Sequence, residues 1–167
     1  MSKKETKTNA MRILDRMRIA YEHFSYDGED FIDGIHVADS LGLPHDIVYK
    51  TLVTQGADKN YYVFVIRIED ELDLKKCAKA VGVKSVSMLP VKDITAVTGY
   101  ICGGCTAIGM KKPYTVRLSD KMQNSESIYI SGGRRGAQLC LSPGDLARAA
   151  GAEFADVTMK NTPCNGD

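Results

Sequence analysis

Two segments rich in β-branched and aromatic residues, joined by a short polar loop, limit most strongly what this chain can fold into. Residues 48–55 and 61–66 have the composition of strands. The loop between them, residues 56–60, contains Gly56 and Asn60 and has the length of a hairpin connection. The two strands are therefore expected to pair antiparallel.

A second strand, turn and strand pattern lies near the C-terminus. Residues 128–131 and 138–141 are largely apolar, and the turn between them carries Gly132, Gly133 and Gly136. Further short strands are predicted near residues 21–26, 85–88, 100–102 and 114–118.

Helical periodicity is clearest in two segments. Residues 10–17 and 74–81 place apolar side chains at i, i+3, i+4 and i+7. Thr8 or Asn9 is positioned to cap the first helix, and Asp73 to cap the second. Three more helices are predicted over residues 34–41, 91–97 and 142–150, the last with a cap serine followed by proline.

Strands outnumber helices in this reading, and most are joined by short turns. This favours an α+β domain with a curved, largely antiparallel mixed sheet, barrel-like, of about six to seven strands with flanking helices. The 167 residues fit one domain, which we expect over residues 9–159, with flexible tails at residues 1–8 and 160–167.

Composition excludes several classes of protein. Lys and Arg number 22 against 21 Asp and Glu, so the chain is not a polybasic scaffold. No apolar run approaches the roughly 18 residues of a membrane span, and the N-terminus lacks the apolar segment of a secretory signal. The five cysteines are an odd number, which favours reduced thiols and a cytoplasmic location.

The near-neutral total conceals a separation of charge along the chain. Residues 21–48 contain seven acidic side chains and no Lys or Arg, whereas residues 101–140 contain six basic and two acidic side chains. Lys111, Lys112, Arg134 and Arg135 lie beside glycine turns, where they suit either a phosphate backbone or a solvated surface. So few charges indicate a short contact with RNA rather than a long footprint.

The Cys102-Gly103-Gly104-Cys105 motif suggests a zinc or redox site. A zinc site normally takes four ligands, and the sequence offers no second cysteine pair or histidine pair. The residues after Cys105 include Gly109 and Pro113, which does not suit the helix that a thioredoxin-type dithiol requires. We therefore favour small, space-filling cysteines and no metal.

Lys50 is the unusual residue of the first strand. By alternation it shares a face with Val48 and Leu52, so its ammonium would lie over an apolar surface and could bind an anion or a carbonyl oxygen. An edge-strand lysine that extends to water is an equally good interpretation. The three histidines stand in segments with no nucleophile signature, so no Ser-His-Asp or Cys-His arrangement is predicted.

Taken in order, several motifs resemble the YbaK/EbsC family of Cys-tRNA(Pro) deacylases, relatives of the editing domain inserted in bacterial prolyl-tRNA synthetases. The resemblance spans residues 9–157. The motifs are Tyr49-Lys50-Thr51-Leu52, Leu72-Asp73-Leu74-Lys75-Lys76, Thr98-Gly99-Tyr100 with Gly103-Gly104, Gly109 and Lys111-Lys112, Ile128-Tyr129-Ile130-Ser131-Gly132-Gly133-Arg134-Arg135-Gly136, and Asp145-Leu146.

The resemblance implies a free-standing editing enzyme without a cofactor, which removes cysteine wrongly esterified to proline tRNA. Lys50 matches the family's essential lysine, which would hold the terminal adenosine or the aminoacyl ester. Gly103 and Gly104 match a loop that lines the aminoacyl pocket and offers backbone N–H groups. In this family the thiol of the cysteine substrate is thought to attack its own ester carbonyl. Further pocket positions implied by the resemblance are Tyr26, Ser131, Gly132 and Asp145.

One departure from the family pattern bears on selectivity. Many members have Ser-Pro where this chain has Thr106-Ala107. A pocket wall distinguishes side chains that differ by a methylene by only about 1–3 kcal/mol, so the change bears on amino-acid choice more than on reaction class. The alternatives are a deacylase for another small amino acid such as alanine, or a non-catalytic module that binds an aminoacyl-tRNA end. The sequence leaves open the oligomeric state and a complex with prolyl-tRNA synthetase.

Overall fold

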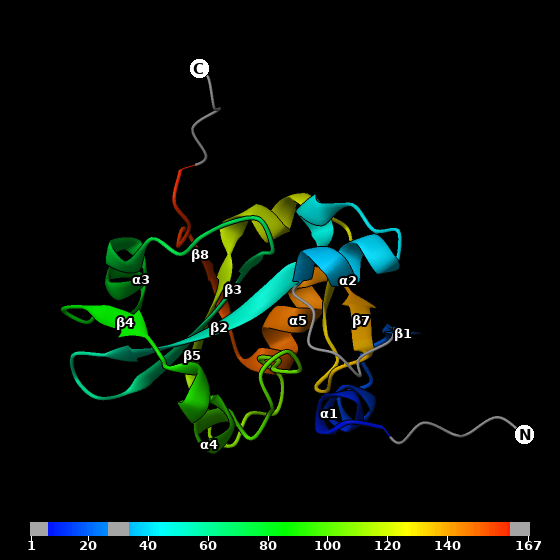
Figure 1. The fold of residues 1–167 in the computed structure, drawn as a ribbon, viewed down its shortest axis with the longest axis horizontal. Coiled ribbons are helices and arrows are strands. Elements are labelled where there is room, and N and C mark those ends of the chain that lie inside the picture. The colour runs from blue at the N-terminus through cyan, green and yellow to red at the C-terminus, as the bar shows by residue number, and fades with distance from the viewer. Residues whose placement is uncertain (1–6, 27–33, 161–167) are drawn as a thin grey trace, which may run out of the picture.

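The computed structural model describes residues 7–26 and 34–160 of the chain. Helices are interspersed with strands and with two β-hairpins along the described residues (Figure 1). The helices are α1 (Asn9–Arg16), α2 (Gly34–Ser40), α3 (Leu74–Val81), α4 (Ile94–Thr98) and α5 (Pro143–Ala150), with 3-10 turns η1 (His45–Ile47), η2 (Val91–Asp93) and η3 (Asp120–Asn124). The strands are β1 (Glu22–Ser25), β2 (Tyr49–Gly56), β3 (Tyr61–Arg67), β4 (Val86–Met88), β5 (Thr115–Ser119), β6 (Ile128–Ser131), β7 (Ala137–Leu141) and β8 (Glu153–Ala155).

The strands form two sheets. The larger has the order β4-β2-β3-β5-β8, and the smaller has the order β1-β7-β6. The predicted hairpin is confirmed: β2 and β3 pair antiparallel, with Lys50 opposite Ile66. The β6–β7 hairpin is confirmed too, with Ser131 opposite Gln138. An isolated parallel bridge between Val48 and Tyr129 connects the sheets.

The predicted α+β class is confirmed, but the prediction of one barrel-like sheet with about six to seven strands is not. The described residues form eight strands in two sheets, with no closed barrel. The pairings are antiparallel except β3 with β5 and β5 with β8. Among the described residues, the bridge between Val48, just before β2, and Tyr129 of β6 is the pairing that joins the two sheets, so they remain separate.

Two local predictions fail for identifiable reasons. The segment 100–102, predicted as a strand, is a loop, because Gly99 and Gly103 on either side of it have φ values of 84° and 88° that no strand accommodates. The short strand β8 was not predicted; its three residues show no alternation, and it forms by parallel pairing with β5.

Both faces of the larger sheet are covered. On one face α3 packs Cys77 and Ala78 against Phe64 and Ile66. On the other face lies the main core, to which α1, α5 and the smaller sheet contribute, with Leu14, Leu139 and Leu146 fully buried. Burial of each such side chain contributes about 1.5–3 kcal/mol, so this second face supplies most of the hydrophobic stabilisation. None of the described helices is long and apolar enough to span a membrane.

Thr8 connects α1 to the second glycine turn. Its hydroxyl accepts a hydrogen bond from the Met11 N–H and donates one to the Gly132 carbonyl at 2.5 Å. The sequence predicts Thr8 or Asn9 as the cap of this helix, and the structure confirms Thr8, whose side chain is buried. Residues 1–6 and 161–167, which make up most of the two predicted tails, lie outside the described residues.

Candidate functional site

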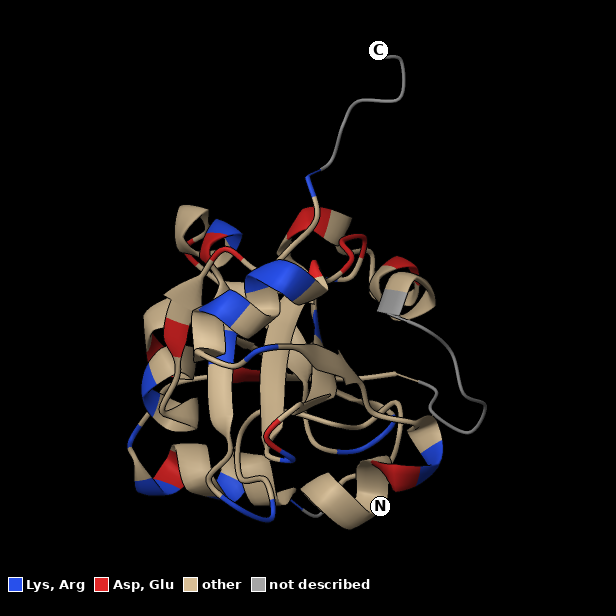
Figure 2. Cartoon of the chain, turned by 90° about the vertical axis from the view of Figure 1, so that its left-hand side faces the viewer, with Lys and Arg blue, Asp and Glu red and all other residues tan. Residues whose placement is uncertain are grey.

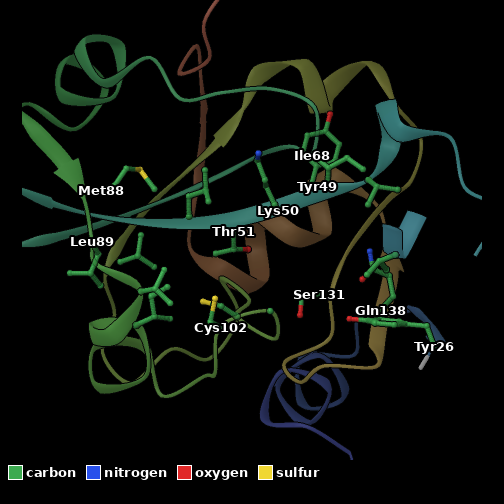
Figure 3. Close-up of a pocket in the computed structure, with 18 residues that line it drawn as sticks. Tyr26, Tyr49, Lys50, Thr51, Ile68, Met88, Leu89, Cys102, Ser131 and Gln138 are labelled. Atoms are coloured by element: carbon green, nitrogen blue, oxygen red, sulfur yellow. The ribbon is translucent and has the colours of Figure 1, made fainter. Parts of the chain in front are cut away.

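A cavity of about 330 Å³ lies where the two sheets meet. One wall is Val48 together with the first part of β2, through Val53, and the opposite side is formed by the Cys102–Cys105 loop and the adjoining ends of β6 and β7 (Figure 3). Val37 of α2 and the segment from Met88 to Ile94 complete the lining. Most of these side chains are apolar, and a few polar groups converge among them, as expected of a small-molecule site.

Lys50, Tyr26, Gly103 and Ser131, four of the predicted site residues, line this cavity. Lys50 and Thr51 project to opposite sides of β2, as strand alternation requires (Figure 3). The cross-strand neighbour of Lys50 is Ile66, which is fully buried. The Lys50 side chain therefore projects from the face of β2 that it shares with Leu52, next to Ile66, and Lys50 is half-buried.

The first glycine pair forms a tight turn whose two glycines have different roles. The Gly104 N–H donates to the Ile101 carbonyl at 2.9 Å, and Gly103 occupies the third position of the turn with φ of 88°. Gly103 lines the cavity, whereas Gly104 is buried behind it, against the backbone of Arg134. Since the turn uses the N–H of Gly104, the backbone N–H of this glycine is already bonded within the protein.

The second glycine turn supports the first. The Gly132 N–H donates to the Ala137 carbonyl at 2.8 Å, which closes the β6–β7 hairpin. The Arg135 Nε donates to the Cys102 carbonyl at 2.9 Å, so the two turns are joined directly. Ser131 faces the cavity and Gly132 does not. Gly132 is therefore placed where it shapes the turn beneath the site.

Asp145 lies apart from the cavity. It is in the first turn of α5, where its N–H donates to the Ser142 hydroxyl at 3.1 Å and its carboxylate lies 3.8 Å from Arg148. Ser142 is thus the cap of α5, as the sequence predicts, and Asp145 takes part through its backbone N–H. The structure does not bring Asp145 together with Lys50.

The structure adds Gln138 to the site. This residue is in the centre of the smaller sheet, between Phe24 on β1 and Ser131 on β6, and is only 4% exposed. It lines the cavity near Ser131 (Figure 3). The sequence feature that could have predicted this role is the single amide side chain in the strand Ala137–Leu141, all of whose residues are buried. A buried amide in such a strand usually has a specific partner.

The two cysteines of the CxxC motif both line the cavity. Burial raises the pKa of the Cys105 thiol to about 11, so it stays protonated near neutral pH and is a poor nucleophile. Within residues 7–26 and 34–160, no three His, Cys, Asp or Glu side chains are grouped so as to hold a metal ion.

Charge is only partly separated in space. Figure 2 shows Lys and Arg at the lower end of the molecule and also on its upper part, with acidic residues most frequent toward the upper right. Lys111 and Lys112 are exposed on the loop that continues from the glycine turn. The Lys111 N–H donates to the Thr98 carbonyl at 2.9 Å, so this loop packs against α4, whose Ile94 lines the cavity.

An ion-pair cluster holds α2, which carries Val37 of the cavity wall, against η1 and the end of β3. The His45 Nε2 is 2.6 Å from Asp39 Oδ1, and its Nδ1 is 3.1 Å from Glu69 Oε2. The hydrogen bond to Asp39, followed by that to Glu69, raises the pKa of His45 above its usual range. Both ring nitrogens can donate only in the protonated form, which these contacts favour.

We expect His45→Gln to destabilise the protein in a pH-dependent way. A raised pKa in the folded state means that the stabilisation is fully present below the unfolded pKa of about 6.5 and is lost as the pH rises through the folded value. The urea midpoint of the variant should therefore fall below that of wild type near about pH 6, with a smaller difference near about pH 9. An equal difference at both pH values would contradict this assignment.

Comparisons with known proteins bear directly on this geometry. A family model described as "Aminoacyl-tRNA editing domain" matches residues 35–149, more than half of the chain. The chain belongs to the aminoacyl-tRNA editing domain family. The matched segment of this editing domain includes Lys50, both glycine turns and Gln138, so it covers most of the cavity. The resemblance stated from the sequence motifs is thereby confirmed.

Relatives of the editing domain extend over nearly its full length. A protein of Enterococcus faecalis, provisionally named the Cys-tRNA(Pro)/Cys-tRNA(Cys) deacylase EbsC, is 43% identical over 163 residues, covering 96% of this chain and 99% of the relative. Among solved structures, a hypothetical protein matches with a TM-score of 0.80 at 21% identity, over 89% of this chain and 97% of its own. A protein described provisionally as a trans-editing enzyme for prolyl-tRNA synthetase matches with a TM-score of 0.76 at 20% identity, over 93% and 100%. These two structures share the fold.

Proposed function

We propose that this chain is a free-standing deacylase that removes cysteine from mischarged Cys-tRNA(Pro). The observation that carries the proposal is the cavity that Lys50, Gly103 and Ser131 all line. Its size suits an aminoacyl group and part of the terminal adenosine. The 43% identity to the Enterococcus protein supports the choice of cysteine and of proline tRNA.

The chemistry proposed is attack by the substrate's own thiol. The thiol sulfur of the cysteinyl group bonds to the ester carbonyl carbon, and the bond from that carbon to the tRNA oxygen breaks. The thiol proton goes to this departing oxygen, which becomes the tRNA hydroxyl. This mechanism fits a site whose own Cys105 has a pKa of about 11 and whose described lining contains no histidine. Lys50 would hold the ester or the terminal adenosine by a charge-assisted hydrogen bond.

The same proposal gives the exposed basic loop a role in binding tRNA. The exposed Lys111 and Lys112, on the loop that packs against α4, would contact phosphates at the acceptor end of the tRNA. Such contacts are screened by salt, so binding should weaken as ionic strength rises. Because a deacylase of this kind acts on tRNA charged by prolyl-tRNA synthetase, we also propose that synthetase as a partner.

Selectivity would depend on Cys105 more directly than on the Thr106-Ala107 departure. Thr106 is fully buried and Ala107 is 6% exposed, and neither lines the cavity. The preceding residue, Cys105, does line it. Its thiol would therefore be part of the wall that meets the substrate side chain.

The proposal is tested by incubating the purified protein with Cys-tRNA(Pro), Ser-tRNA(Pro) and Ala-tRNA(Pro) and following the loss of aminoacyl ester. Ser-tRNA(Pro) is the matched control, because it replaces only the sulfur by oxygen. We expect deacylation of the cysteinyl substrate alone. Faster loss of alanine would indicate a deacylase for another small amino acid, and nuclease protection of the tRNA without ester loss would indicate a binding module.

A further inference from the structure

The first half of β2 presents a free strand edge to the cavity. The Ile68 N–H donates to the Val48 carbonyl at 3.0 Å and the Gly56 N–H to the Asn60 carbonyl at 2.8 Å, so even-numbered residues of β2 direct their backbone groups toward β3. Odd-numbered residues direct theirs away from β3. The Val53 carbonyl confirms this direction, because it accepts from the Leu89 N–H on the opposite side at 3.0 Å.

Thr51 lies in the open part of this edge. On its N-terminal side, the edge is occupied at the Val48–Tyr129 bridge. On its C-terminal side, it is occupied by the hydrogen bond from Leu89 to Val53 and by β4, which pairs with β2 from Thr54 onward. Among the described residues, no strand pairs with β2 on this side between those points. The N–H and carbonyl of Thr51 therefore face the cavity, which residues 48–53 line without interruption. An unpaired strand edge is a ready template for a further chain.

We propose that the α-aminoacyl ester of the substrate binds this edge as a strand of one residue. The Thr51 N–H donates to the ester carbonyl oxygen, and the Thr51 carbonyl accepts from the α-ammonium. The α-ammonium and the carbonyl of an L-amino ester correspond to the N–H donor and the carbonyl acceptor of one residue in an antiparallel partner strand. Both hydrogen bonds therefore form with the backbone of Thr51 and need no side chain. This inference rests on the proposed function, because it names how the aminoacyl end is held.

The pairing fixes where the rest of the substrate lies. Opposed residues of an antiparallel pair project to the same side of the sheet. The Thr51 side chain is on the side of β2 that faces Cys102 and Ser131 (Figure 3), so the amino-acid side chain would enter between the glycine turn and β6. The adjoining ribose would then lie toward Lys50, on the other side of the strand. The Thr51 N–H would also stabilise the negative charge that develops on the carbonyl oxygen during attack.

The test follows the backbone amide of Thr51 directly. The probe is 3′-cysteinylamino-3′-deoxyadenosine, in which an amide replaces the ester and prevents cleavage. On titration into the 15N-labelled protein we expect the Thr51 amide resonance to move and its hydrogen exchange to slow at least about tenfold, as for a bonded amide. The amides of Lys50 and Leu52, which face β3, serve as controls and should keep their exchange rates. The analogue with a 3-mercaptopropionyl group, which lacks the α-amine, should bind about tenfold more weakly.

Variants give a second measurement. Thr51→Pro removes the N–H at a position where the ladder with β3 does not use it, whereas Thr51→Val removes only the hydroxyl. We expect kcat/KM of the proline variant to be about a hundredfold below that of the valine variant. Probe binding with an unchanged Thr51 amide, or equal activity of the two folded variants, would overturn the inference. Failure of the wild type to deacylate Cys-tRNA(Pro) is a separate result and concerns the proposed function.

Discussion

Replacing Lys50 with methionine is expected to lower kcat/KM for deacylation of Cys-tRNA(Pro) by about a hundredfold to a thousandfold. Methionine approximates the length and volume of the lysine stem, so the variant removes the ammonium while retaining contact with the apolar face beside Ile66. A charge-assisted hydrogen bond is worth about twice a neutral one, and its effect increases in a cavity that excludes water. The measurement is single-turnover loss of the aminoacyl ester.

A matched control separates this effect from a general change of charge. Lys75 is exposed on α3, outside the cavity, so Lys75→Met makes the same chemical change on the surface and should retain wild-type activity. Lys50→Arg keeps the charge but replaces a compact ammonium by a planar group, and should recover only part of the loss. Activity of Lys50→Met within a fewfold of wild type would show that Lys50 takes no part in the reaction.

The position of Lys50 could be predicted because it depends on local rules. Strand alternation placed its side chain opposite that of Thr51, and the five-residue loop between the two runs predicted the antiparallel partner that brings Ile66 beside it. Helix ends were predictable for the same reason. Asp73 accepts from the N–H groups of Lys75 and Lys76, and Gly82 ends α3 with a φ of 74°.

The remaining features depend on contacts between distant segments, which no local pattern encodes. Asp145 fits a family motif and a helix cap equally well in sequence, and only the path of the chain shows that α5 holds it away from the cavity. Gln138 has a weak local signal but enters the site because β7 is central in the smaller sheet. The division into two sheets follows from how little of β2 the Tyr129 bridge occupies. That same gap leaves Thr51 facing the cavity.

Gly104 makes the clearest long-range contact of the site, with the backbone of the second glycine turn. The sequence predicts glycine-rich turns here but does not show that two of them lie against each other. A Cβ at Gly104 would lie 2.7 Å from the Arg134 Cα and 2.9 Å from the Arg135 nitrogen, so this glycine permits the two turns to touch through their backbones. The contact joins segments about thirty residues apart, each of which supplies a wall of the cavity.

Gly104→Ala is therefore expected to damage both stability and activity. The atoms it meets are backbone, which cannot rotate aside, so the two turns must move apart. Forced insertion of a methyl group into a packed site costs typically about 1–3 kcal/mol, and we expect a loss of that size in the free energy of unfolding. The displacement would shift Gly103 relative to Ser131, and small misplacements of a site lower activity by about a hundredfold. Urea unfolding and single-turnover deacylation measure the two effects.

Gly144→Ala provides the matched control, because the same substitution there meets no heavy atom within 4 Å. Gly144 lies in the first turn of α5, where alanine favours the helix, so this variant should be as stable as wild type or slightly more stable. If both alanine variants unfold at the wild-type urea concentration and retain activity, the close approach at Gly104 is not needed. If only Gly104→Ala loses stability and activity, the two glycine turns act as one unit that fixes the width of the cavity.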